Sequence, residues 1–178
     1  MRAALRTWNA LHSSLYGEKL FSVRVDESGG HSPISNTCEF EGNNRQIIVR
    51  RAKTAEEWAA AGFPSNSPGL NIRCSTEAEG LVKQTIILGP DNGRVGGREQ
   101  FQSVFLHEVG HSIGLDHSCD MAGGAGKAGC NSLDMGHAFR RAVMFPYLTV
   151  NEKTRISEIK SNLRENDEER AQCILQAR

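Results

Sequence analysis

The residues best suited to chemistry lie together in one short segment, HEVGHSIGLDH at residues 107–117. Residues four apart share one face of a helix, so His107 and His111 can bind one metal ion together. Gly114 permits a left-handed turn, which would bring His117 round as a third ligand. Three protein ligands leave the fourth tetrahedral position of zinc open, as is typical of catalytic rather than structural zinc sites.

The competing interpretation is an amphipathic helix whose histidines are incidental. Half of the six histidines of the chain fall within this one segment. An unpaired buried imidazole is costly, and a shared zinc ion would satisfy all three. Glu108 is not needed as a ligand, and its place beside His107 suits a general base. The pattern therefore favours a zinc centre that activates water.

The same residues carry a family resemblance. Residues 107–117 are similar to the metzincin signature H-E-x-x-H-x-x-G-x-x-H, which is followed along the chain by a methionine turn. Residues 142–147, AVMFPY, resemble that turn, and Met144 would inherit the role of an apolar floor beneath the zinc. Ser118 after the third histidine and Pro146 two residues after the methionine are most similar to the matrixin (matrix-metalloprotease-like) branch. Pro146 stands where other branches carry a tyrosine, so no tyrosine ligand is implied, and a core role for Met144 remains the alternative.

The resemblance implies a zinc-dependent endopeptidase with one catalytic zinc ion. Glu108 would act as general base on a zinc-bound water and then pass the proton to the leaving amine. Protein or peptide substrates would bind in extended form against an edge strand, for which residues 70–76 are the candidate. An apolar substrate pocket would be lined by residues that serve equally well as core: Val104, Leu115, Pro146, Tyr147 and Leu148.

The sequence departs from matrixins in several respects. His12 and His31 are the only histidines upstream of the signature, so we expect no second, structural zinc. The stretch from His117 to Met144 is long, so specificity cannot be copied from the family. Residues 89–97 could hold calcium, although Asp91-Asn92-Gly93 is first of all a turn signal. No P-R-C-G-x-P-D-like inhibitory string occurs.

Two other functions remain open. A non-catalytic zinc module for binding or inhibition would have no use for Glu108. A zinc hydrolase acting on a non-peptide substrate would share the ligands, but the methionine turn argues against it.

Composition fits a single domain over residues 1–178, and the metzincin resemblance implies that it is a catalytic domain with an upper subdomain at about 1–117 and a lower one at about 118–178. The chain has 178 residues, of which 38% are hydrophobic and 24% charged, which suits one globular domain. Lys+Arg and Asp+Glu both total 21, so the charge predicts neither a nucleic acid nor an anionic membrane as partner. No stretch is long and apolar enough for a membrane span or a signal peptide core, and we expect a monomer.

Five cysteines are too scattered for a Cys-x-x-Cys zinc module. Secretion would favour one or two disulfides, of which Cys119 with Cys130 is the first candidate because it closes a glycine-rich loop. Cys38 with Cys74 is the second, which leaves Cys173 free. Five reduced thiols in a cytosolic protein are the alternative, and the disulfides would favour a secreted or extracytoplasmic protein.

Periodicity predicts an α+β protein with a twisted sheet flanked by helices. The resemblance implies a metzincin-like (zincin) catalytic domain, with a twisted mixed sheet, an active-site helix and a C-terminal subdomain ending in a helix. Helices are expected at residues 2–15, 55–61, 98–113 and 167–176, the second capped by Thr54 and the last by Asn166. Strands are expected at residues 19–25, 46–50, 70–76 and 81–88. Residues 29–44, 62–69 and 119–136 are expected to be largely irregular.

Overall fold

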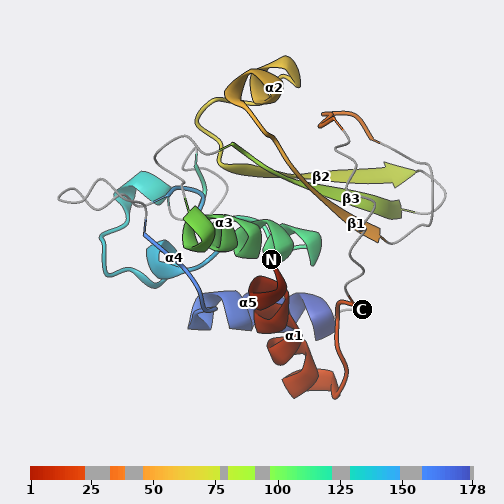
Figure 1. Ribbon diagram of the computed structural model, residues 1–178. Coiled ribbons are helices and arrows are strands. Elements are labelled where there is room, and N and C mark those ends of the chain that lie inside the picture. Colours follow the sequence, from red (N-terminus) through yellow and green to blue (C-terminus); the bar gives the residue numbers. More distant parts are fainter. Residues whose placement is uncertain are drawn as a thin grey trace.

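The computed structural model describes residues 1–22, 33–38, 46–76, 80–90, 97–121, 129–148 and 158–176. The described elements form layers, with α2 above a sheet, α3 beneath the sheet, and α1 and α5 on the far side of α3 (Figure 1). Helix α3, Gly97–Ser112, is thus enclosed between the sheet and two further helices. Its position explains why eight of its residues are buried.

Helix α1, Arg2–Tyr16, confirms the first predicted helix and ends at Gly17, whose φ of 75° is left-handed. The strand predicted at residues 19–25 is wrong where it can be seen, because residues 19–22 form no strand. The backbone of Phe21 is occupied by Asn9, whose side chain accepts from its N–H at 2.7 Å and donates to its carbonyl at 3.0 Å. Both backbone groups of Phe21 are therefore satisfied without a sheet partner, and residues 23–25 lie outside the described part.

The sheet has three described strands in the order β1-β3-β2. β1, Gln46–Arg51, runs parallel to the central β3, Gly80–Leu88, and β2, Gly69–Thr76, runs antiparallel to it. This confirms three predicted strands to within a residue or so at each end, and it gives a mixed sheet. In the described part of the chain β2 pairs on one side only, so the strand proposed as an edge lies at an edge.

Helix α2, Ala55–Ala60, covers the sheet face opposite α3. Thr54 caps it as predicted, accepting from the N–H of Glu57 at 3.2 Å. The Glu57 carboxylate accepts from the N–H of Lys53 at 2.7 Å, one residue before the capping residue. Trp58 packs with Ile34, Ala52 and Ile87 in a small apolar cluster of its own.

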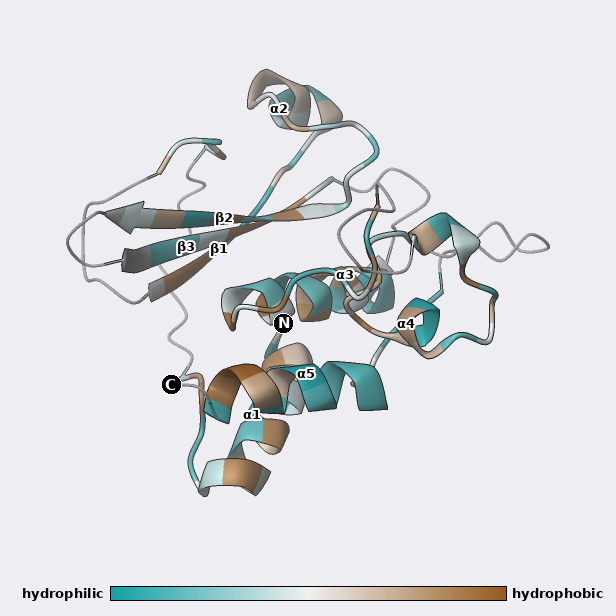
Figure 2. Ribbon diagram, turned by 180° about the vertical axis from the view of Figure 1, so that it is seen from behind, coloured by the Kyte–Doolittle hydropathy of each residue, from teal (hydrophilic) through white to brown (hydrophobic). Residues whose placement is uncertain are grey.

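The main core lies around α3. It joins α1 and α5 to the α3 side of the sheet through buried side chains that include Trp8, Ile86, Val109 and Met144. Trp8 also donates from its indole nitrogen to the carbonyl of Leu106 at 3.0 Å, so α1 is fixed to α3 by a hydrogen bond as well as by packing. Figure 2 shows how apolar residues alternate with polar ones along these elements.

The chain after α3 is mostly irregular. It contains a 3-10 turn η1, Cys130–Ser132, a short helix α4, Ala138–Arg141, and the C-terminal helix α5, Glu165–Gln176. The prediction that Asn166 caps the last helix is wrong, because α5 begins at Glu165. The cause is Asp167, whose side chain accepts from the N–H of Arg164 at 3.0 Å and so starts the helix earlier.

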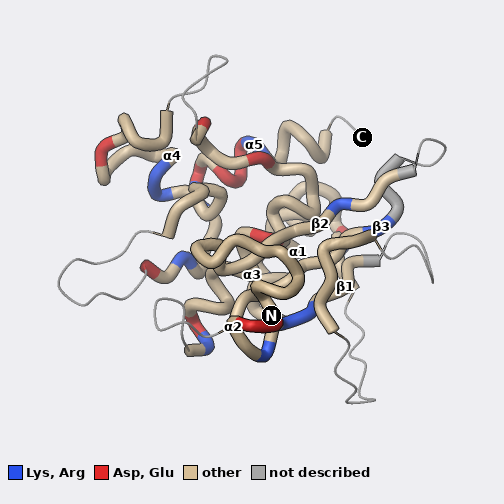
Figure 3. Tube along the Cα trace, turned by 90° about the horizontal axis from the view of Figure 1, so that it is seen from above, with Lys and Arg blue, Asp and Glu red and all other residues tan. Residues whose placement is uncertain are grey.

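Two disulfides join Cys38 to Cys74 and Cys119 to Cys130, and Cys173 is free and exposed. Both predicted pairings are confirmed. The described residues thus form a mixed α+β structure with a small three-stranded sheet. No helix among them is long and apolar enough to cross a membrane. Lys and Arg positions and Asp and Glu positions are spread over several elements (Figure 3).

Candidate metal centre

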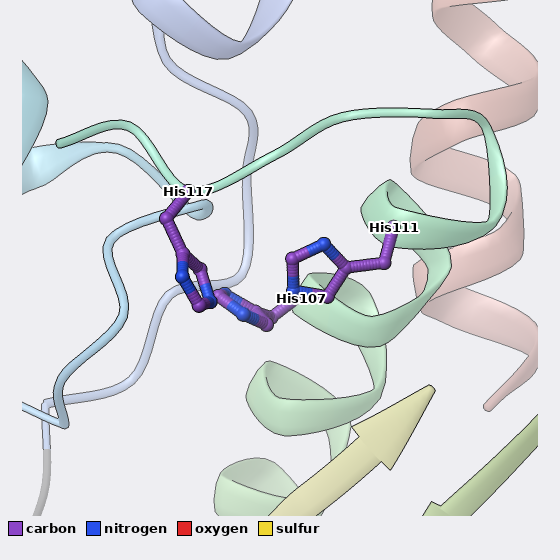
Figure 4. Close-up of side chains that lie close together, drawn as sticks. All are labelled: His107, His111 and His117. Carbon is purple, nitrogen blue, oxygen red and sulfur yellow. The ribbon is translucent and has the colours of Figure 1, made fainter. Parts of the chain in front are cut away.

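Three imidazoles converge at the end of α3. His107 and His111 project from successive turns of the helix, and His117 reaches them from the chain that follows (Figure 4). Their ring centroids are 4.8 to 5.4 Å apart, and one nitrogen from each lies within 4.8 Å of the others. The structure therefore brings these three side chains together, as the sequence predicted, and their geometry suits a shared metal ion.

Hydrogen bonds fix the orientation of two of the rings. The Nδ1 atoms of His107 and His111 lie 2.7 Å from the carbonyl oxygens of Val143 and Leu115. A carbonyl only accepts, so each Nδ1 carries the proton and each Nε2 keeps its lone pair. Ligating histidines usually make this second contact, which selects the tautomer and holds the ring.

The turn after α3 has the form that its glycine predicts. Gly114 has a φ of 100°, and the N–H of Leu115 bonds back to the carbonyl of Gly110 at 3.1 Å. The chain reverses direction here, so the Leu115 carbonyl faces His111 and His117 comes into range of the helix. A side chain at position 114 would be strained in this conformation.

Glu108 follows His107 in α3, and its side chain is shielded from solvent. Its side chain is 5% exposed, and burial raises its pKa to about 8. The strand β2 passes close to it at Gly69, where an added Cβ would lie 3.2 Å from a Glu108 carboxylate oxygen and would also collide with Val104. A glycine at position 69 therefore leaves room for the Glu108 carboxyl group beside the sheet edge.

Two of the three histidines are held neutral. The pKa of His107 is lowered to about 3, mainly by burial and next by the neighbouring His111. The pKa of His111 is lowered too, first by burial. Metal ligation requires the deprotonated imidazole, so the environment favours the form that binds metal.

Met144 lies against the underside of α3. It is fully buried, and an added Cβ on Gly110 would strike its sulfur atom. The N–H of Phe145 bonds to the carbonyl of Ala142 at 3.3 Å, which closes a turn with Met144 at its third position. The carbonyl of Met144 accepts from the N–H of Ser118 at 2.9 Å, next to the third histidine. Its role as a floor under a metal stays a prediction.

The C-terminal segment fixes this turn by charged side chains that sequence reasoning missed. Asp167, fully buried, accepts from the N–H groups of Val143 and Met144 at 2.8 and 3.1 Å. Lys160 donates to the carbonyls of Arg140 and Ala142 at 3.0 and 2.6 Å. Burial lowers the pKa of the Lys160 ammonium to about 8.

Arg170 completes this support on the histidine side. Its guanidinium donates to the carbonyls of Asp116 and His117 at 2.9 and 3.2 Å. Helix α5 therefore contacts both the methionine turn and the third histidine. Nothing in the spacing of these residues reveals such contacts, because they depend on where α5 packs.

The residues predicted to line a substrate pocket divide into two groups. Val104 and Leu115 are buried in the main core, at 3% and 0% exposure. Tyr147 is 40% exposed beside Phe145, while Pro146 and Leu148 are half-buried. The pocket itself stays a prediction. The calcium hypothesis concerned residues 89–97, of which 91–96 lie outside the described part, as does His31.

Comparison with known protein families, with characterised proteins and with solved structures found no match for this chain.

Proposed function

We propose that this protein is a zinc-dependent endopeptidase of the metzincin type. The observation that carries the proposal is the convergence of three imidazoles at the end of the helix that carries the buried carboxyl group of Glu108, which does not belong to the histidine cluster. A binding module would require the imidazoles alone. The additional carboxyl group is what a hydrolytic reaction requires.

The donor set fits zinc. Three imidazole nitrogens from one helix and its following turn are a common catalytic zinc ligand set, and two of the rings already have the supporting carbonyl contacts that zinc-binding histidines usually make. An ion held by His107, His111 and His117 would supply Lewis-acid polarisation of a peptide carbonyl and activation of water. All three ligands are uncharged, so no thiolate or carboxylate reduces the charge of the ion.

Glu108 takes the proton-transfer role. Its carboxylate, which a cation bound by the histidines would favour over the protonated form, accepts a proton from the attacking water and returns it to the amine that leaves when the peptide bond breaks. The low exposure of the side chain keeps bulk water from competing for that proton. Asn71 of β2 donates to the carbonyl of Glu108 at 2.9 Å, so the edge strand and the catalytic helix stay in fixed register at this point.

The substrate would bind in extended form along β2. This strand pairs with β3 on one side only within the described part of the chain, and it passes directly over Glu108 at Gly69. An added strand would place its peptide groups beside the imidazoles. The two disulfides are consistent with an extracellular protein, and we propose that the enzyme is secreted.

A paired assay tests the proposal. The apo protein is loaded with one equivalent of zinc and incubated with a mixed peptide library, and cleavage is followed by mass spectrometry. Glu108→Gln should retain zinc and melting temperature but lose at least about 10²-fold in rate. Glu99→Gln is the matched control, since Glu99 is an exposed carboxylate in the first turn of the same helix.

Wild-type rates in Glu108→Gln with zinc bound would remove Glu108 from the mechanism. Stoichiometric zinc binding without any cleavage would instead favour a binding module.

A further inference from the structure

Alternate residues of β2 face helix α3, which carries two of the three histidines. Gly69 abuts Val104 and Glu108, and the Asn71 side chain donates to the Glu108 carbonyl and to the Ser112 hydroxyl. Leu70 and Ile72 pack instead on the opposite face, in the cluster around Trp58. Because strand side chains alternate, Arg73 belongs to the face that carries Gly69 and Asn71.

Arg73 is the exposed member of this row. It follows Asn71, whose side chain reaches Ser112 in the last turn of α3, so Arg73 lies beyond Asn71 toward the carboxyl end of that helix.

The guanidinium groups of Arg170 and Arg73 differ in their partners. Arg170 is engaged by the carbonyls of Asp116 and His117, whereas Arg73 makes no hydrogen bond or ion pair with the described chain. Within the described residues, an unpaired guanidinium thus stands on the face of the edge strand that is turned toward α3.

We propose that Arg73 selects an acidic side chain in the peptide substrate. The inference rests on the proposed peptidase function and names the substrate class of that site. A peptide that pairs with the free edge of β2 presents its own alternate side chains on the face of Arg73, at cross-strand distance. Glutamate or aspartate at that position meets the guanidinium, whereas lysine or arginine is repelled by it.

The position of the acidic residue follows from the register. Gly69 lies at Glu108, and Arg73 lies further toward the carboxyl end of β2. Successive same-face side chains are about 6.5 to 7 Å apart along a strand, so the selected residue lies a few residues from the scissile bond rather than next to it. In a peptide antiparallel to β2 it lies on the amino-terminal side of that bond.

The expected preference is modest because the pair is exposed. A cross-strand charge pair corresponds to about two- to five-fold in kcat/KM, and the preference should weaken as salt screens it. Reversal of the charge at Arg73 should change the ratio between cleavage of acidic and of basic peptides the most.

The experiment compares two peptides that differ only in an acidic or a basic residue at each position near the cleaved bond. The zinc-loaded wild type should favour the acidic peptide, Arg73→Ala should cleave both alike, and Arg73→Glu should favour the basic one. Arg2→Glu makes the same charge change on the exposed start of α1 and should leave the wild-type ratio unaltered. Zinc content and melting temperature are measured for every variant.

Binding to zinc-loaded Glu108→Gln gives a second readout that does not require turnover. Equal cleavage ratios in the wild type and Arg73→Glu would overturn the role of Arg73 while leaving the peptidase intact. Failure of the wild type to cleave any peptide, together with failure of Glu108→Gln to bind one, would overturn the peptidase function and this inference with it.

Discussion

Two regions of the molecule supply the candidate metal ligands in different ways. His107 and His111 come from a regular helix that is covered by the sheet on one side and by α1 and α5 on the other. His117 comes from irregular chain, as does Met144. The first region is ordered by secondary structure. The second is ordered by single hydrogen bonds from Asp167, Lys160 and Arg170 and by one disulfide.

The two regions differ in how many contacts stabilise them. In a helix, the loss of one contact leaves many equivalent ones in place. In the irregular region a single side chain holds several backbone groups at once, so one substitution can release them together. We therefore expect changes in the irregular region to lower zinc affinity and stability together, and changes on the sheet side to lower stability alone.

The largest effect should follow loss of Asp167. Asp167→Ala leaves three backbone N–H groups without their acceptor, those of Val143, Met144 and Arg164. The free energy of unfolding should fall by about 3 to 5 kcal/mol, because each buried unpaired donor costs about 1 to 3 kcal/mol. Zinc affinity should fall as well, because Val143 also supplies the carbonyl that orients His107.

Asp167→Asn is the milder change, because its amide oxygen can still accept part of these hydrogen bonds. This variant should lose less stability and less zinc affinity than Asp167→Ala. Chemical denaturation and a competitive zinc chelator give both quantities. Unchanged zinc affinity in a folded Asp167→Ala protein would contradict the coupling between α5 and His107.

Removal of each disulfide should affect stability and zinc affinity in opposite orders. Cys38–Cys74 encloses a sequence separation of 36 and Cys119–Cys130 one of 11, so replacing both cysteines by serine should cost about 4 and about 3 kcal/mol of stability respectively. Zinc affinity should follow the opposite order. Cys119 lies two residues after His117, and Cys130 packs in the same cluster as Phe145, the residue after Met144.

Denaturant titration of the two double variants measures the loss of stability, and competition with a chelator measures the loss of zinc affinity. A larger loss of zinc affinity in the Cys38–Cys74 variant would show that the sheet side controls the metal centre.

The same division explains how much the sequence alone could predict. The helix of His107 and His111, three strands and the glycine turn at Gly114 all follow local rules of period and backbone conformation. Both cysteine pairings were predicted, one from the loop that it closes. The strand predicted at residues 19–25 is wrong over residues 19–22, because Asn9, from the preceding helix, satisfies the backbone of Phe21.

The supporting residues of the site were not predictable in this way. Asp167 reads as an ordinary acidic residue in the first turn of a helix, and Lys160 and Arg170 as ordinary surface cations. Their importance depends on α5 lying against the methionine turn, which is a long-range contact. No period or motif in the sequence encodes it.

An intermediate effect is expected at Gly110, where the two regions touch. In an exposed helix, glycine to alanine gains about 1 kcal/mol. Here the added Cβ would strike the sulfur of Met144 and would lie 3.2 Å from the Trp8 ring, so Gly110→Ala should cost about 1 to 3 kcal/mol through overpacking. Met144→Ala alone should cost about 2 to 5 kcal/mol, and Met144→Leu under about 1.5 kcal/mol.

The double variant Gly110→Ala, Met144→Ala tests the contact itself. Truncation of the methionine removes the sulfur that the new methyl group meets, so the double variant should lose less stability than the sum of the two single changes. Strict additivity in thermal unfolding would mean that Met144 does not lie against Gly110.

The smallest effect should come from the sheet side, at the cap of α2. Thr54→Ala removes the oxygen that accepts from the N–H of Glu57 and should cost about 1 kcal/mol of stability. Zinc affinity and peptidase rate should be unaltered, because α2 lies across the sheet from α3 and its Trp58 packs in a separate apolar cluster. Thr54→Ser retains an accepting hydroxyl and should recover most of the loss. If Thr54→Ala weakened zinc binding as much as Asp167→Ala, then the sheet would transmit disturbances from its far face, and the two regions would not be independent supports of the site.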